Sequence, residues 1–466
     1  MTDRPEASPG RLGLGGPAAV PQPPGLRVVL DIRPAQEPGR APATAAYLTE
    51  LLAAYAADPA EGESFVLLLQ AGGEDPTAAP EFDRLDVVGR RLLPPTRLLR
   101  SGAMTIDPFL LRGVSLGAAW HAERGGAHGA VYHTAAGAAP LASGLPVVVS
   151  VLDLAPWELP GTYQAGTIAS FGRRLRVRIL RDAAAVIVGS EASGRAARRL
   201  LHLRRDRIHV VPLAARAAFS PAAAAGTADE VARLGLPGRY LVYPGRYDAR
   251  QDLVTLLRAL STLAAGPSPA AGRRRSSRAR PDDVPWPPRI LLVGASPEDR
   301  AALARAAARE GVGELISYAP SLPPERLAAV VAGARAVVLP VLSEAAGTAA
   351  IEAFACGTPV VASAVGALPE LVAGAGILVE PRDPDRLAAA ISTAWADDAV
   401  HDRIAADSRA RAAGPRRTWA DVARETRAVY AAVGLAAGRG DGPDRAGRED
   451  GSDRPDLSDR PDRTDR

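Results

Sequence analysis

Residues 339–359 read LPVLSEAAGTAAIEAFACGTP, after the apolar run AVV and leading into PVVAS. We interpret this stretch as a strand, a loop of small residues, a short helix and a second strand. If the helix begins near Gly347, its free amides and the positive end of its dipole suit a phosphate. Glu344 lies just before that helix and Glu352 lies within it. Because a carboxylate accepts hydrogen bonds from two neighbouring hydroxyls, sugars suit both side chains.

A plainer interpretation of the same stretch stays open. Glu344 could simply complement the helix dipole, and Glu352 could lie on a solvated face. The surrounding sequence is needed to choose between the two.

Apolar, strand-like runs alternate with amphipathic stretches along most of the chain, which is typical of α/β domains with a mainly parallel sheet. The first series is LRVVLDI, SFVLLLQ, GAVYH, PVVVSV and AAVIVGS, with candidate helices such as 43–57 and 191–202. The second series starts near Arg239 with RYLVYPG, RILLVG, ELISYA, RAVVLP, TPVVAS and GILVEP. Two series of similar size predict two doubly wound domains, since 466 residues exceed one ordinary core.

The expected domain organisation follows from these series and from three segments outside them. Two domains are predicted, at 26–215 and at 216–416, and the second carries the Glu344 loop. A helix over 417–437 is expected to cross back onto the first domain. The Pro- and Gly-rich segment, the arginine-rich surface insertion and the DRPD-repeating tail are expected to be flexible, at 1–25, 266–288 and 438–466.

Composition excludes several classes of protein. All 56 basic residues are arginine and the net charge is +4, with no base-reading helix or zinc-finger spacing, so no nucleic-acid partner is expected. A single cysteine, Cys356, and the lack of a secretory signal or a long apolar run favour a cytoplasmic protein. No cluster has metal-ligand spacing, and the Asp-x-Asp pair Asp383 and Asp385 is expected to cap a helix.

One segment raises the question of membrane contact. Residues 171–207 contain eleven arginines and three acidic residues, a local charge of +8. Such a patch would suit an anionic membrane surface, giving a peripheral position at the inner face of the membrane, or a phosphorylated acceptor. An exposed helix also needs charge, so both readings stay open.

The run SEAAGTAAIEAFACGTPVVASAVGALPELVAGAGILVEPRDPDRLAAAI resembles the C-terminal domain of glycosyltransferase family 4, the retaining group 1 enzymes of GT-B architecture. The hallmark is Glu, seven residues and Glu, followed by acGtPVvaS, gGlpE and gaGllv-P segments, and all four occur here in order. The resemblance covers roughly 26–435 and is weaker in the first half. It implies two Rossmann-like domains facing a cleft, an acceptor domain at 26–215 and a nucleotide-sugar domain at 216–416. The donor would be a nucleotide-diphosphate sugar, and the acceptor would be a hydroxyl group in glycan or glycolipid synthesis. Neither a metal nor a further cofactor is implied.

The resemblance also implies roles for individual residues. Glu344 would contact hydroxyls of the transferred sugar, and Glu352 would hold the ribose of the nucleotide. Gly347 and Thr348 would offer backbone amides to the donor. In YPGRYDARQDL the family places an arginine and then a lysine against the diphosphate. The residues that correspond to this pair are Arg246 at the first position and Gln251 at the second, with Arg250 beside it.

The first domain departs further from the family pattern. It lacks the family's glycine-rich loop after the first strand, and PVVVSVLDL has Leu152 where the family has histidine. Asp153 follows and is a catalytic candidate, although it could equally cap a turn. His133 ends another strand and could substitute in space, but a structural role is favoured.

Two other functions therefore stay open beside hexosyl transfer, for which a mannosyl group is one option. One is a catalytically degenerate GT-B protein that binds a nucleotide sugar or a partner without turnover. The other is a nucleotide-sugar epimerase of similar architecture, against which the Glu-to-Glu motif argues.

Overall fold

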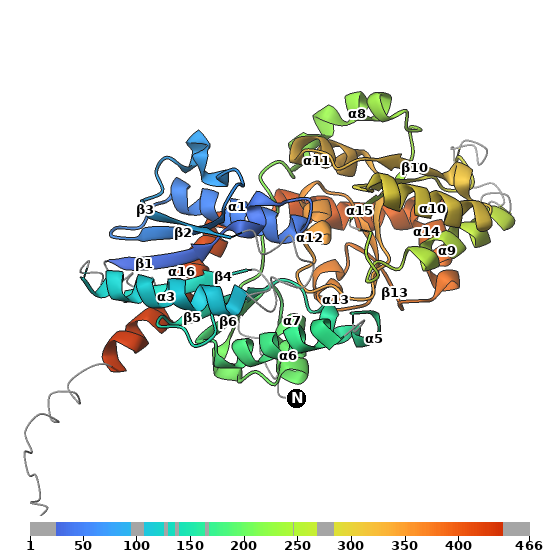
Figure 1. The fold of residues 1–466 in the computed structure, drawn as a ribbon. Coiled ribbons are helices and arrows are strands. Elements are labelled where there is room, and N and C mark those ends of the chain that lie inside the picture. Colours follow the sequence, from blue (N-terminus) through green and yellow to red (C-terminus); the bar gives the residue numbers. More distant parts are fainter. Residues whose placement is uncertain are drawn as a thin grey trace, which may run out of the picture.

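The computed structural model of the chain describes residues 25–94, 107–124, 129–135, 139–163, 167–245, 247–267 and 284–440. Two sheets, each made of parallel strands, follow one another along the described chain, as the alternating sequence pattern predicts. Figure 1 shows them next to each other, each with helices packed around it. Most of the predicted flexible segments lie outside the described residues, where their character stays a prediction. The prediction is wrong for the described end of the insertion, because Val284 and Trp286 pack against a hydrophobic core, and for 438–440, which continue the last described helix.

The first sheet has the strand order β3-β2-β1-β4-β5-β6-β7. Its strands are β1 (Leu26–Asp31), β2 (Ser64–Gln70), β3 (Val87–Leu93), β4 (Gly129–Thr134), β5 (Val147–Val151), β6 (Ala185–Val188) and β7 (Ile208–Val210). The helices of this half are α1 (Pro42–Ala57), α3 (Asp107–Arg124), α4 (Ala155–Glu158), α5 (Pro160–Tyr163), α6 (Thr167–Asp182) and α7 (Glu191–Leu201). The central strands are almost fully buried, because helices cover both faces of a parallel sheet.

The sequence reading missed β3 and β7, the two edge strands of this sheet. β3 reads VVGRRLL and is mostly exposed, and β7 has three half-buried residues, so neither carries a continuous apolar run. Edge strands need less burial than central ones, which weakens the signal.

The second sheet has the order β10-β9-β8-β11-β12-β13. Its strands are β8 (Leu241–Pro244), β9 (Ile290–Val293), β10 (Ile316–Ala319), β11 (Ala336–Leu339), β12 (Val360–Ser363) and β13 (Gly376–Val379). The helices are α8 (Thr227–Leu234), α9 (Leu253–Ala265), α10 (Pro297–Arg309), α11 (Pro324–Gly333), α12 (Thr348–Ala355), α13 (Leu368–Val372), α14 (Pro384–Ala396) and α15 (Asp398–Ala413). Asp383 caps α14 by accepting the amide hydrogen of Arg386, as expected.

The last described helix, α16 (Trp419–Gly440), returns to the first half of the chain and packs among α1, β4 and β6. Val422, Val429 and Tyr430 are buried in the core that includes β1 and α1. Arg427 of α16 is 5 % exposed and forks onto Glu63, with Nη2 2.7 Å from Oε2 and Nε 3.0 Å from Oε1. This buried ion pair holds the C-terminal helix against the N-terminal sheet.

We expect Arg427→Lys to lower the free energy of unfolding by about 1.5–3 kcal/mol, the cost of losing a hydrogen bond to a charged group at a forked contact. Arg424→Lys is the matched control, because Arg424 is an exposed residue of the same helix that pairs with Asp421. Urea unfolding of the two variants measures the difference. Equal stabilities would show that the fork contributes no more than a surface pair.

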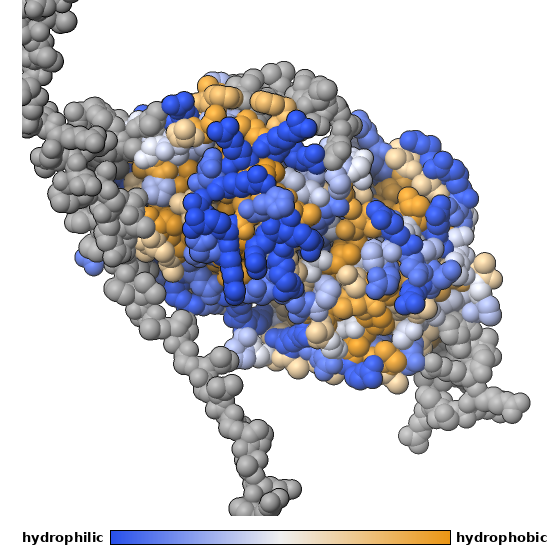
Figure 2. Space-filling model, turned by 90° about the horizontal axis from the view of Figure 1, so that it is seen from below, coloured by the Kyte–Doolittle hydropathy of each residue, from blue (hydrophilic) through white to orange (hydrophobic). Residues whose placement is uncertain are grey.

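The helix α6 presents one exposed stripe, in which Phe171, Arg174, Arg178 and Arg181 recur at helical spacing. Phe171 is 56 % exposed. Figure 2 looks onto the side of the molecule where α6 lies in Figure 1, and shows a band of hydrophilic side chains there. Among the described residues, no helix combines the length and apolar character that a bilayer-spanning segment needs.

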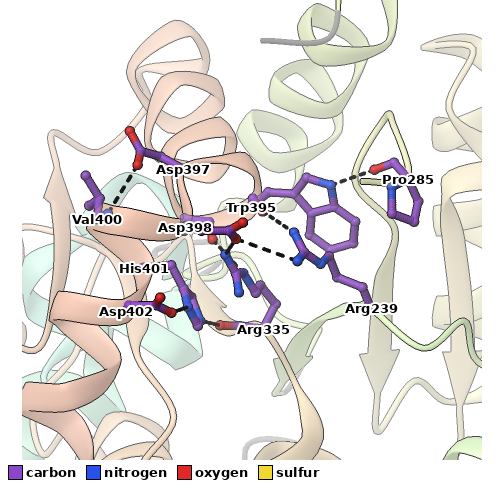
Figure 3. Close-up of polar contacts among 10 residues, drawn as sticks. Arg239, Pro285, Arg335, Trp395, Asp397, Asp398, Val400, His401 and Asp402 are labelled. Atoms are coloured by element: carbon purple, nitrogen blue, oxygen red, sulfur yellow. Dashed lines mark hydrogen bonds and ion pairs between the residues drawn. The ribbon is translucent and has the colours of Figure 1, made fainter. Parts of the chain in front are cut away.

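A cluster of polar side chains lies at the amino ends of strands β8 and β11 of the second sheet (Figure 3). Arg335, just before β11, donates to Asp398 at 2.5 Å and to the carbonyl of Ala394. Arg239, just before β8, donates to the carbonyl of Trp395. These bonds tie the strand starts to the α14–α15 junction. The opposite, carboxyl edge of the sheet carries the loops described next.

Candidate active site

The loop between β11 and α12 holds Glu344 in a bent conformation. Gly347 precedes α12 with φ of +71°, a left-handed geometry that glycine adopts without strain. Its amide donates to Oε1 of Glu344 at 2.8 Å. Glu344 is half-buried, and burial raises its pKa, an effect that the Gly347 amide and the Arg250 guanidinium partly offset. The Gly347 amide thus bonds to Glu344 in this structure, and its predicted contact with the donor stays a prediction.

The backbone of Glu344 is clamped by a second glycine loop. Gly366 has φ of +53°, and a Cβ atom there would lie 1.8 Å from the carbonyl oxygen of Glu344. The amide of Ala367 donates to that same oxygen at 2.9 Å. The segment AVGALPE, part of the family resemblance, thus fixes the position of the first carboxylate.

Arg250 reaches the same loop because two segments of backbone pair with each other. The amide of Leu342 donates to the carbonyl of Arg250, and the amide of Asp252 donates to that of Pro340, both at 2.7 Å. An antiparallel bridge joins Gln251 to Val341 between these bonds. Gln251, at the family's lysine position, therefore takes part in backbone pairing. The guanidinium of its neighbour Arg250 lies near Glu344.

Asp153 and Arg250 meet across the two halves of the chain. Nη1 of Arg250 lies 3.0 Å from Oδ2 of Asp153, and Nε lies 3.3 Å from Oδ1 of Asp248. The other oxygen of Asp153 accepts the amide hydrogen of Ala155 at the start of α4. Asp153 therefore caps a turn, as one reading predicts, and also contacts a predicted phosphate-binding arginine, while its catalytic role stays a prediction.

Glu352 points away from solvent and is engaged by an arginine that the sequence reading missed. Nε of Arg216 lies 2.6 Å from Oε1 of Glu352 and Nη2 lies 3.2 Å from Oε2. Glu352 is 6 % exposed. Burial raises its pKa and Arg216 opposes that shift. Arg216 also lies over the Phe219 ring at 4.8 Å.

Arg216 had little to mark it in the sequence. It stands in LAARAAF, beside the predicted boundary between the domains. The only feature that could have drawn attention to Arg216 is that it is a single charged residue among small apolar ones.

The first half of the chain grips the loop through the start of α7. Ser190 caps that helix by accepting the amide hydrogen of Ser193, and both hydroxyls donate to the carbonyl of Ala345, at 3.0 and 2.6 Å. The amide of Ala192 donates to Glu370 at 2.7 Å. The loop around Glu344 is thus positioned by residues of both halves.

The remaining candidates differ in where they lie. Thr348 is the half-buried first residue of α12, whereas Arg246 lies outside the described residues. Leu152 packs against the core of the first sheet. Within the described ranges, no group of three His, Cys, Asp or Glu residues could hold a metal ion. Cys356 is buried at the end of α12, consistent with the role of a small hydrophobe.

His133 belongs to a buried network under α16. Its Nε2 lies 2.9 Å from the hydroxyl of Ser150, and its Nδ1 lies 2.6 Å from that of Tyr430. Tyr47 bonds to the same serine at 2.8 Å. Burial lowers the pKa of His133 to about 3, opposed by Asp31. The imidazole is a neutral core residue, so the favoured structural reading is confirmed.

The buried imidazole makes stability depend on pH. The unfolded histidine takes up a proton near its ordinary pKa, whereas folded His133 stays neutral until about pH 3, so stability falls as the pH falls. From about pH 6.5 to 5 this group should remove about 1.7 kcal/mol. We expect His133→Asn to be less stable at neutral pH but to lose less on acidification. Urea unfolding at several pH values measures both quantities, and an unchanged slope would contradict the assignment.

Comparison with known proteins assigns both halves of the chain. Residues 42–214 match the family described as glycosyl transferase 4-like domain, and residues 238–397 match glycosyl transferases group 1. The second match contains Glu344, Glu352 and Arg250 and the loops that hold them.

Two curated relatives carry enzyme names. The chain is 30% identical to a D-inositol 3-phosphate glycosyltransferase of Jonesia denitrificans over 270 residues, which are 56% of this chain and 59% of that protein. It is 29% identical to the O-antigen chain mannosyltransferase B of Escherichia coli over 239 residues, 50% of this chain and 56% of the relative. The match thus spans less than two thirds of either relative.

Two solved structures share the fold. Sucrose-phosphate synthase from Thermosynechococcus elongatus superposes with a TM-score of 0.64 at 22% identity, covering 89% of this chain and 100% of that one. Anabaena HepE in complex with UDP and glucose gives 0.60 at 17% identity, covering 88% and 100%. With both domain families matched in order and this architecture around the paired glutamates, the chain belongs to the group 1 glycosyltransferases of GT-B fold.

Proposed function

We propose that this glycosyltransferase moves a hexose from a nucleotide-diphosphate sugar to a hydroxyl acceptor with retention of anomeric configuration and without a metal ion. One observation supports this most: Glu344, Arg250 and Asp153 converge at the carboxyl edge of the second sheet, with Glu352 on the helix that follows the Glu344 loop. Ligands of parallel sheets bind at that edge.

The donor would lie along the β11–α12 loop. Glu352, held by Arg216, would accept hydrogen bonds from the ribose hydroxyls, and Glu344 would accept them from the sugar. HepE, of the same fold, is described in complex with UDP and glucose, which supports a donor of this class.

Arg250 would stabilise the leaving diphosphate. As the bond from the anomeric carbon to the phosphate oxygen breaks, negative charge grows on that oxygen, and a guanidinium fork is suited to it. The acceptor oxygen bonds to the anomeric carbon, and its proton passes to the departing phosphate. In this structure the guanidinium of Arg250 pairs with the carboxylate of Asp153, so donor binding would replace that carboxylate with the diphosphate. Arg246, by the family resemblance, would contribute a second cation.

The acceptor is proposed from the relatives' names. They point to an inositol phosphate or a growing polysaccharide chain, with mannose among the sugars transferred.

The first experiment is a calorimetric screen of UDP-, GDP- and ADP-sugars, followed by mass spectrometry of reactions with inositol phosphate and oligomannose acceptors. We expect saturable donor binding, a product one hexose heavier than its acceptor, an unchanged anomeric configuration, and activity that withstands EDTA. Donor binding with neither transfer nor hydrolysis would refute the enzymatic proposal.

A second candidate function has its own support. Glu352 is already satisfied by Arg216, Asp153 is paired with Arg250, and Leu152 stands where the family has histidine. These features favour a degenerate protein that binds a nucleotide sugar or a partner without turnover. The same screen separates the two functions, because the degenerate protein would bind donors and leave them intact.

We also propose that the α6 stripe contacts an anionic membrane. An exposed phenylalanine among arginines suits an interface of lipid headgroups and acyl chains. Vesicles containing phosphatidylglycerol should sediment the protein at low salt, and Arg174→Glu with Arg178→Glu should abolish this. Arg258→Glu on α9 is the control, an exposed arginine of the second half. Retention of binding by the α6 double variant would rule the stripe out.

A further inference from the structure

A groove of roughly 820 Å³ lies beside the first sheet, and none of the candidate site residues lines it. Its floor is the edge strand β7, one wall is α7 and the other is α16. Each helix contributes residues at i, i+3, i+4 and i+7, so each presents one continuous face.

The groove runs along the open edge of the sheet. Four consecutive residues, 208–211, line it. Since alternate side chains of a strand point to opposite faces, consecutive residues can share one groove only when it follows the strand's edge. Among the described strands, β7 pairs with β6 alone.

The hydrogen-bond register shows which peptide groups point into the groove. The amide of Val211 donates to the carbonyl of Val188 at 2.9 Å, so Val211 and His209 direct their backbone groups toward β6. In a parallel ladder the intervening residues, Ile208 and Val210, direct theirs outward. The amide of Ile208 donates to the carbonyl of Arg205, so within the described chain the outward groups without a backbone hydrogen bond are the carbonyl of Ile208 and the peptide groups of Val210.

The groove is positively charged above an apolar floor. Arg195, Arg198 and Arg205 line it, and none of them pairs with a carboxylate of the described residues. Of its two carboxylates, Glu425 is neutralised by a fork from Arg417 at 2.6 and 2.8 Å.

We propose that this groove docks an extended, acidic segment of a partner protein, which adds to the sheet as a strand beside β7. Outward peptide groups two residues apart, about 6.6 Å along the strand, match the repeat of another strand. Alternate acidic side chains of that segment would reach the arginines of α7, and the intervening apolar ones would cover Val429 and its neighbours. A single phosphate or lipid headgroup would leave the carbonyl of Ile208 and the peptide groups of Val210 unpaired.

The test uses a fluorescein-labelled hexapeptide of alternating glutamate and valine, with fluorescence anisotropy on the full-length protein. We expect saturable binding that weakens with salt, and Arg195→Glu with Arg198→Glu should weaken it at least about tenfold, or 1.4 kcal/mol. Arg199→Glu is the matched control, since Arg199 is exposed on the same helix but outside the groove. It should change the affinity less than about twofold.

Two further measurements separate strand pairing from simple charge attraction. A copy of the peptide with N-methylated valine amides keeps its charge but cannot donate to β7, so it should bind at least about tenfold more weakly. Hydrogen exchange at the amide of Val210 should slow with the unmodified peptide bound.

Three results would overturn the proposal. They are the absence of saturable binding up to about 1 mM peptide, equal binding of the N-methylated copy, or equal losses in Arg199→Glu and the double variant. Loss of phosphatidylglycerol vesicle binding in the same double variant, without a peptide effect, would assign the groove to lipid instead.

Discussion

Gly366→Ala is expected to destabilise the protein by roughly 4 kcal/mol and to abolish donor binding. Two effects add at this residue. The φ of +53° is unfavourable for alanine by about 1–2 kcal/mol, and the new Cβ would lie 1.8 Å from the carbonyl oxygen of Glu344. A backbone oxygen cannot swing aside as a flexible side chain can, so the whole Glu344 loop must move.

Gly311→Ala is the control that separates the steric contact of the new Cβ atom from the cost of the left-handed backbone conformation. Gly311 has a φ of +71°, yet nothing lies within 4 Å of the position its Cβ would take. This variant should lose only the stability that the left-handed conformation costs an alanine, and its affinity for the donor should be unchanged. Urea unfolding and calorimetry with the best donor nucleotide measure both variants. Equal stabilities would show that the Glu344 loop yields easily to the added methyl group.

Glu352→Gln is expected to weaken nucleotide affinity about 10–100-fold, because charge-assisted hydrogen bonds are each worth about 1.5–3 kcal/mol. The amide keeps the size of the carboxylate but can no longer bind the Arg216 fork with both oxygens. The loss should appear in the affinity for the nucleoside diphosphate alone, since the ribose is common to product and donor.

Two comparisons make the Glu352 result specific. Arg216→Met keeps packing over Phe219 but removes the charge that positions Glu352, so affinity should fall by a smaller factor and kcat should change little. Glu298→Gln, an exposed carboxylate at the start of α10, should leave affinity unchanged. Full affinity in Glu352→Gln would contradict a ribose contact.

Much of the fold could be predicted from local pattern. The central strands of both sheets appeared as apolar runs, because strands buried on both faces need continuous hydrophobic sequence. The helix start at Asp383 was readable, since a cap is a local hydrogen bond. The edge strands β3 and β7 were missed because exposure removes that pattern.

Only part of the candidate site could be predicted from the sequence. The Glu344 and Glu352 pair stands eight residues apart in one loop and helix, so its spacing survives in the sequence. Arg216 was missed, since its partner Glu352 lies 136 residues further along the chain. Arg250 was placed beside Gln251 in sequence, but its contact with Asp153 depends on how the two halves meet.

The sequence alone determined the parallel α/β architecture, the paired glutamates and the helix caps, because each depends on residues within a few turns of one another. Tertiary structure alone decided which charges meet: Arg216 with Glu352, Arg250 with Asp153, and two α7 hydroxyls with the carbonyl of Ala345 up to 155 residues away. The physical reason is that strand order and helix packing set distances between remote segments, and no local period records them.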